Sequence, residues 1–156
     1  MSLTYEIEGL SGTSADLSLF GDLTFEEMAK KALNEVRPEV EAGTKAALRS
    51  SIQHPGDSEL VNSVKTFEPS MTGNGEGARL SCGFTGKSSS GNRYHTVSRG
   101  RSTTKPVLNS DKAFWLEYGV AGRQPARPWK DRAISSVESK VTGKIEQAIS
   151  KELGAT

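Results

Sequence analysis

The chain has 156 residues, with 20 basic and 19 acidic side chains and a formal net charge of +1. This balance argues against a nucleic-acid or membrane partner for the protein as a whole, and no apolar run approaches the roughly 20 residues that a membrane span needs. Cys82 is the only cysteine, which excludes an internal disulfide. We expect no signal peptide and a single domain over residues 1–156.

The first third of the chain predicts a strand followed by a long helix. Residues 4–8 alternate between apolar and polar side chains, which predicts a short strand. The sequence TFEE at residues 24–27 is typical of a helix capping box. Apolar residues then recur at helical spacing as far as Ile52, with a kink or break expected at Pro38.

The middle of the chain predicts strands and a long loop. Residues 63–67 and 79–84 have the alternation of strands, with a glycine-rich turn at 73–77 between them. Residues 86–105 are rich in Ser, Gly and Thr and show no clear period. We interpret them as an extended functional or flexible loop, because they are too long for a tight turn.

The last third predicts a C-terminal helix. Residues 113–118 are compatible with a strand or a short helix. Pro128 is expected in the first turn of the helix that follows, where its missing N–H costs nothing. The expected buried stripe consists of Ile134, Val137, Val141, Ile145, Ala148, Ile149 and Leu153. The whole pattern predicts an α+β domain with an N-terminal strand, a long kinked helix, an antiparallel sheet bearing the extended loop, and a C-terminal amphipathic helix.

Catalysis has little support in the sequence. His54 and His95 have no metal-ligand partner at helical spacing, and the glycine-rich segment 73–77 lacks the Lys-Ser/Thr of a phosphate loop. The carboxylates between residues 26 and 41 are interpreted as the solvated face of the long helix. We therefore predict a protein that is not an enzyme and that needs no metal or cofactor.

A basic loop is the first candidate for an interaction surface. No acidic residue occurs between residues 77 and 110. The predicted loop carries Lys87, Arg93, Arg99, Arg101 and Lys105. Such a loop can contact phosphates without reading sequence. An acidic protein partner and a merely solvated excursion are the alternatives.

The segment between the aromatic run and the last helix is the second candidate. Arg127 and Trp129 are residue types that anchor protein interfaces. Trp129 packed into the domain's own core is the alternative. The candidate interface residues are Trp115, Glu117, Tyr118, Arg127, Pro128 and Trp129.

These residues resemble a known family. The sequences AFWLEYG at residues 113–119 and PARPW at 125–129 resemble the tailed-phage neck and tail-completion (head–tail connector) proteins, typified by the tenth gene product of a lambda-like coliphage. Residues 57–64 and 5–10 are similar to further parts of the family pattern. The chain departs from the pattern because it lacks the Gly of the family's Asp-Thr-Gly, because Val120 and Trp129 stand where the family has Thr and Phe, and because the loop 86–105 is enlarged.

The resemblance implies a structural virion or prophage protein. Such a protein forms a ring, expected to be a hexamer, at the head–tail junction or tail terminus, and is needed for joining heads to tails and for DNA passage. Its expected partners are its own copies, adjacent head-completion or adaptor proteins, tail proteins and, without sequence preference, the DNA in the lumen. Its expected location is the virion neck, after assembly in the cytoplasm of a host bacterium. The alternative is a small, non-specific nucleic-acid-binding module that uses the basic loop 87–105.

Overall fold

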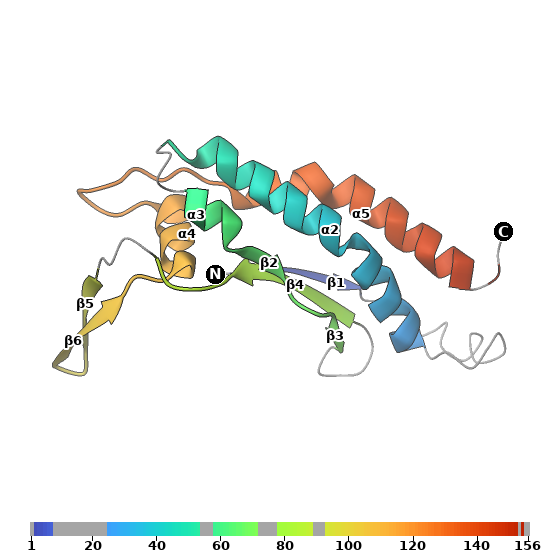
Figure 1. The fold of residues 1–156 in the computed structure, drawn as a ribbon, viewed down its shortest axis with the longest axis horizontal. Coiled ribbons are helices and arrows are strands. Elements are labelled where there is room, and N and C mark those ends of the chain that lie inside the picture. Colours follow the sequence, from blue (N-terminus) through green and yellow to red (C-terminus); the bar gives the residue numbers. More distant parts are fainter. Residues whose placement is uncertain are drawn as a thin grey trace.

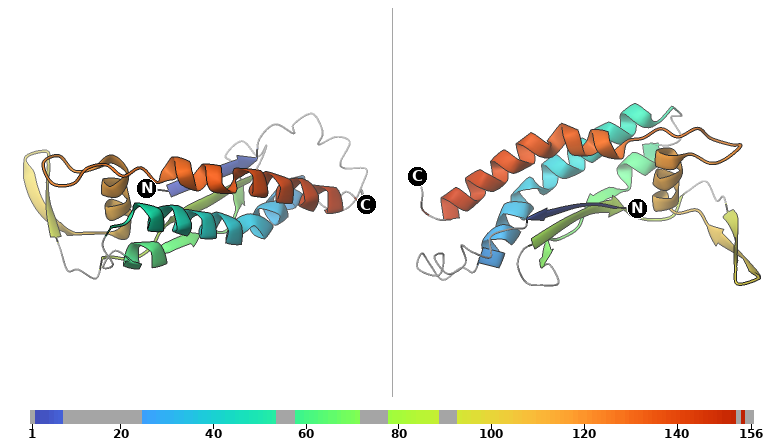
Figure 2. Two further views of the ribbon diagram at one scale, coloured as in Figure 1. Left: turned by 90° about the horizontal axis from the view of Figure 1, so that it is seen from above. Right: turned by 180° about the vertical axis from the view of Figure 1, so that it is seen from behind.

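The computed structural model describes residues 2–7, 25–53, 58–71, 78–88, 93–152 and 154. Two long helices lie side by side over one face of a small antiparallel sheet, and a separate hairpin projects from one end (Figures 1 and 2). The predicted α+β class is confirmed, including the N-terminal strand, the long helix and the C-terminal helix.

The sheet is organised around β4 (Ala78–Phe84). β1 (Ser2–Ile7) pairs antiparallel with the length of β4, from Ser2 opposite Gly83 to Ile7 opposite Ala78. β2 (Val64–Thr66) and the two-residue β3 (Ser70–Met71) also pair with β4. The strands expected near residues 4–8, 63–67 and 79–84 are thus present. Every second side chain of β4 is buried, as the period of a strand with one covered face requires.

The helix α2 (Phe25–Ser51) supplies the largest share of the core. It continues through Pro38 and bends along its length (Figure 1). Its fully buried side chains recur every three or four residues, which gives the apolar stripe of an amphipathic helix. They include Ala29, Ala32, Leu33, Val36, Val40 and Leu48. The short α3 (Ser58–Asn62) adds Leu60 and Val61 to the same core.

The C-terminal helix α5 (Lys130–Glu152) runs antiparallel to α2 and packs closely against it (Figure 2). A Cβ atom built on Gly43 would lie 2.0 Å from Cγ1 of Val137, so only glycine permits this approach. Glycine inside a helix is about 1 kcal/mol less favourable than alanine. At Gly43 the close approach of α2 and α5 explains why glycine occupies the position nevertheless.

The predicted stripe of α5 is correct from Val137 to Ala148 and wrong at Ile134, whereas Ile149 is half-buried and Leu153 lies outside the described residues. Val137, Val141 and Ala148 are buried, and Ile145 is partly buried against the core. Ile134 is 38% exposed, and Ala133 occupies the buried position instead. α5 begins at Lys130, one turn before Ile134, which is the first large apolar residue of the predicted stripe. Ala133 is small, so the sequence pattern gives it too little weight to show that it, and not Ile134, faces the core.

Two carboxylates of α2 join it to its neighbours, so the interpretation of these residues as a solvated face is wrong for both. Glu39 forms an ion pair with Lys144 of α5. Glu41 accepts a hydrogen bond from Nζ of Lys45 at 2.6 Å and another from the backbone N–H of Thr66 at 3.2 Å. The hydrogen bond from Lys45 is the main reason why the pKa of Glu41 is lowered from its ordinary value of 4.5.

Candidate interaction surfaces

The aromatic segment forms the helix α4 (Asn109–Tyr118), which settles the choice between strand and helix. The helix stops at Gly119, which has a φ of 77°. A Cβ atom there would lie 2.8 Å from the backbone nitrogen of Ala126 and 2.8 Å from the carbonyl oxygen of Gln124. Glycine is therefore required both for the backbone conformation and for the close approach of the returning loop.

Glu117 connects the end of α4 to the start of α5. Its Oε2 accepts hydrogen bonds from the backbone N–H of Trp129 at 2.7 Å and of Lys130 at 3.1 Å. The first N–H groups of a helix have no partner within the helix, and a carboxylate satisfies them while also favouring the positive end of the helix dipole. Glu117 therefore has a structural task as the cap of α5.

Trp129 lies in the protein's own core, so its prediction as an interface residue is wrong and the alternative is correct. Its side chain is 0% exposed. The indole Nε1–H donates to the carbonyl oxygen of Ala113 at 3.1 Å. The ring of Phe84 meets the indole edge to face, with centroids 5.5 Å apart. The indole thus joins α4, β4 and α5, and its one polar group is satisfied.

Arg127 and Arg132 also bond to their own chain. The guanidinium of Arg127 donates to the side-chain oxygen of Gln53 at 2.7 Å, just beyond the end of α2. Arg132 donates to the hydroxyl of Ser50 at 3.2 Å and to the carbonyl oxygen of Pro128 at 3.1 Å. Pro128 is exposed and precedes α5, which begins at Lys130, so it does not lie within the first helical turn as predicted. The end of α2, the end of α4 and the start of α5 meet here, and we call this junction the corner.

Tyr118 is the predicted interface residue with the most exposed ring. It is 58% exposed, and its ring lies 4.8 Å from that of Phe114, which is 50% exposed. Trp115, on a different face of α4, is half-buried. Phe114 was not predicted as a site residue, because a residue four positions away lies next to Tyr118 only if the segment is helical, whereas in a strand the two would be about 13 Å apart on the same face.

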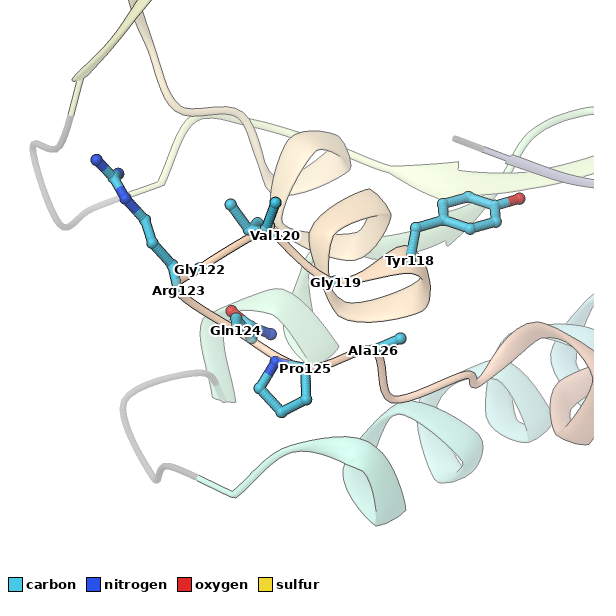
Figure 3. Close-up of a pocket in the computed structure, with 9 residues that line it drawn as sticks. Tyr118, Gly119, Val120, Gly122, Arg123, Gln124, Pro125 and Ala126 are labelled. Carbon is cyan, nitrogen blue, oxygen red and sulfur yellow. The ribbon is translucent and has the colours of Figure 1, made fainter.

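A shallow hollow lies beside the corner, lined by residues 118–126. Tyr118 and Arg123 extend from the loop in opposite directions (Figure 3). Their polar groups do not converge on a common point, and convergent polar groups are what define a ligand site. The hollow is therefore a consequence of the loop's path around Gly119.

The basic segment is largely a β-hairpin, which corrects the expectation of a loop without secondary structure. β5 (Arg93–Ser98) and β6 (Arg101–Pro106) pair in register from Arg93 opposite Pro106 to Ser98 opposite Arg101. Arg99 and Gly100 form the two-residue turn with φ values of 51° and 75°. Positive φ at both positions matches a type I′ turn, whose twist suits a hairpin.

We call residues 87–106 the arm. Its base is tied to the body by a bridge between Lys87 and Leu108 and by the hydrogen bond from the N–H of Ser88 to the carbonyl oxygen of Val107, at 2.9 Å. Beyond that base, the hairpin projects away from the helices and the sheet (Figure 1). The basic residues of the arm are all exposed: Lys87, Arg93, Arg99, Arg101 and Lys105.

Catalytic chemistry gains no support from the described part of the chain. No group of three or more His, Cys, Asp or Glu side chains there is arranged to hold a metal ion. His54 lies outside the described residues, as does the side chain of His95. Cys82 is buried, which raises the pKa of its thiol. None of the described helices is long and apolar enough to cross a membrane.

Comparison with models of protein families, with curated proteins and with solved structures finds no match to this chain.

Proposed function

We propose that this protein is a structural subunit that assembles into a ring at the head–tail junction or tail terminus of a tailed phage or a related particle. The sequence resemblance supplies the biological context, and the arm is the observation that carries the proposal. It is a two-stranded hairpin whose strands pack mainly against each other. An isolated two-stranded hairpin is only marginally stable in water, so an arm of this kind is suited to contact another molecule.

The exposed aromatic pair is a second reason to propose that the end of the molecule that carries the arm is an assembly surface. Phe114 and Tyr118 lie on α4, the helix that follows the base of the arm. Large exposed aromatic side chains next to a polar, basic surface are characteristic of protein interfaces. Hydrogen bonds of the corner join α4, which carries this aromatic pair, to the start of α5. In this proposal the protein has no catalytic step and takes no cofactor or metal.

The expected partners are copies of this chain and the neighbouring head-completion, adaptor and tail proteins, in the neck of a virion that assembles in the bacterial cytoplasm. Light scattering after size exclusion, combined with negative-stain electron microscopy, tests the proposal. A closed ring of fixed mass, with six copies expected, would support it. A protein that stays monomeric at every concentration, without and with its genomic neighbours, would contradict it.

The hairpin also favours a second candidate, a non-specific nucleic-acid-binding module. A two-stranded β-ribbon fits the major groove of DNA, and the arm carries cations without carboxylates. Such a module would bind DNA as a monomer, and the logarithm of its binding constant would fall linearly with that of the salt concentration, by about 0.9 for each phosphate contacted. A gel-shift titration at several salt concentrations separates this candidate from a ring subunit.

A further inference from the structure

One side of α5 is exposed and acidic. Asp131, Glu138 and Glu146 follow one another at intervals of seven and eight residues, which places them on the same side of a helix. All three are exposed, and no ion pair among the described residues includes them. Ile134, which is 38% exposed, lies on this side as well. We call the exposed residues of this side the acidic flank: Asp131, Ile134, Ser135, Glu138, Thr142 and Glu146.

The acidic flank faces away from α2, and the basic residues of α5 lie on its other sides. Lys144 forms an ion pair with Glu39 of α2. Arg132 donates to the hydroxyl of Ser50 near the end of α2. The acidic flank itself contains no Lys or Arg. Charge is therefore segregated around α5, and the described part of the chain leaves this acidic, partly apolar helix face uncovered.

We propose that the arm of one copy docks on the acidic flank of a second copy. The contact rests on the proposed function, because it needs a protein that assembles with its own copies. Beyond its base the arm projects away from α5 of its own chain (Figure 1). A contact between two unlike surfaces is heterologous, and it generates a closed ring when the rotation between copies closes.

The charges of the two surfaces are opposite in sign and similarly spaced. Arg101 and Lys105 are four residues apart on β6, so they share one face of the hairpin at a separation of about 13 Å. The rise of 1.5 Å per residue separates Asp131 from Glu138 and Glu138 from Glu146 by about 11 and 12 Å along α5. Complementary charges of this kind select the partner and fix the register of an interface.

The apolar part of the acidic flank fits the same partner. The long side chains of Arg and Lys pack their methylene groups on apolar surface while the charged groups stay at its edge. Arg101 or Lys105 can therefore cover the exposed part of Ile134 and still reach a carboxylate beside it. A row of like charges on a marginally stable hairpin is unfavourable in isolation, and docking on carboxylates removes this repulsion.

DNA is the weaker partner for the arm. Its phosphates could pair with the same cations, but the carboxylates of the acidic flank attract no polyanion. A second copy uses both surfaces at once, so self-association accounts for the exposed bases of the arm and for the exposed acids of α5.

Charge reversal on both surfaces tests the contact. One variant reverses the arm (Arg99→Glu with Arg101→Glu), and a second reverses the acidic flank (Glu138→Lys with Glu146→Lys). Asp131 is left unchanged, because its carboxylate lies in the first turn of α5 and favours the helix dipole. Sedimentation velocity at low salt should show that each reversal raises the dissociation constant of self-association by about tenfold or more. A variant with all four changes should recover most of that loss, because its charges are complementary again.

A matched control makes the same change of net charge away from the acidic flank (Glu35→Lys with Glu68→Lys). Glu35 is an exposed residue of α2, and Glu68 is an exposed residue between β2 and β3. The control should keep the dissociation constant of the wild type. A control as damaging as the flank variant would overturn the inference, because net charge alone would then explain the loss.

The remaining outcomes separate this contact from the alternatives. An arm reversal without effect on self-association, or a combined variant that does not recover, would overturn the inference. Loss of DNA binding on arm reversal, with self-association retained, would assign the arm to DNA instead. Rings formed by the wild type without charge rescue would refute only this contact. A wild type that is always monomeric would refute the proposed function as well.

Discussion

The corner between α4 and α5 and the arm lie at the same end of the molecule and are both rich in Arg, but they use these side chains in opposite ways. Arg127 and Arg132 of the corner bond to Gln53, Ser50 and a backbone carbonyl of their own chain. The arginines of the arm are exposed.

Backbone hydrogen bonding explains the difference. Three helix ends meet at the corner, and each helix end leaves backbone groups without partners inside the helix. Glu117 satisfies two N–H groups there, and Arg132 donates to the carbonyl of Pro128. In the arm, the backbone groups of the two strands pair with each other, so side chains are left for outside contacts. Residue type alone therefore does not separate an interface from a structural junction.

Replacing Trp129 should break the corner and have the largest effect on stability. Trp129→Ala removes a fully buried indole and its hydrogen bond to Ala113, so the free energy of unfolding should fall by about 3–5 kcal/mol. Urea denaturation measures the loss. Phe114→Ala, at a half-exposed ring, should cost less than about 1 kcal/mol. Equal losses for the two variants would contradict the assignment of Trp129 to the core.

Two glycines test the helix packing that supports the corner. Gly43→Ala places a Cβ against Val137 and should lower the free energy of unfolding by about 1–3 kcal/mol through overpacking. Gly143→Ala on α5 meets nothing within 4 Å and should raise it by about 1 kcal/mol, because alanine favours the helix. Thermal unfolding of both variants checks the opposite signs. A gain in stability for both would show that α2 and α5 are not in close contact.

Removing the cap from α5 should have a smaller effect. Glu117→Ala leaves the N–H groups of Trp129 and Lys130 without their carboxylate and should cost about 0.5–2 kcal/mol. Glu138→Ala, an exposed position further along α5, serves as the control and should change the free energy of unfolding by less than about 0.5 kcal/mol. Chemical denaturation measures the free energy of unfolding of both variants. A loss for Glu117→Ala no larger than that for Glu138→Ala would contradict the role of Glu117 as the cap of α5.

The arm should have the smallest effect on stability. Arg99→Glu with Arg101→Glu changes only exposed side chains at the hairpin tip, so the free energy of unfolding of the protomer should stay within about 0.5 kcal/mol of the wild type. Denaturation below the concentration of self-association measures this. A large loss would mean that the arm helps to hold the fold of its own chain.

Much of the fold was predictable from the sequence because its apolar periods are long. The stripes of α2 and α5 and the alternation in β4 follow from burial against one core. The hairpin was missed because its I′ turn begins with Arg99 instead of the usual Asn, Asp or Gly. The sequences of its two strands, RYHTVS and RSTTKP, also lack an apolar alternation.

The candidate site was only partly predictable. The sequence predicts that the segment at residues 113–118 carries interface residues. Its role depends on its secondary structure, and six residues of mixed propensity do not determine whether they form a strand or a helix. Only the helix brings Phe114 beside Tyr118 and places Glu117 at the start of α5. Tryptophan occurs both in protein cores and in interfaces, so the residue type of Trp129 does not tell which role it has. Only the complete burial of its side chain in the structure assigns it to the core.

The central claim is that the corner maintains the fold while the arm joins copies of the chain. A comparison of the oligomer mass of the wild type with that of the arm variant tests this claim most directly. Light scattering after size exclusion at low salt should show a closed oligomer for the wild type. The variant with Arg99→Glu and Arg101→Glu should be a monomer with an unchanged free energy of unfolding. An arm variant that keeps the wild-type mass, or a wild type that is a monomer throughout, would contradict the account.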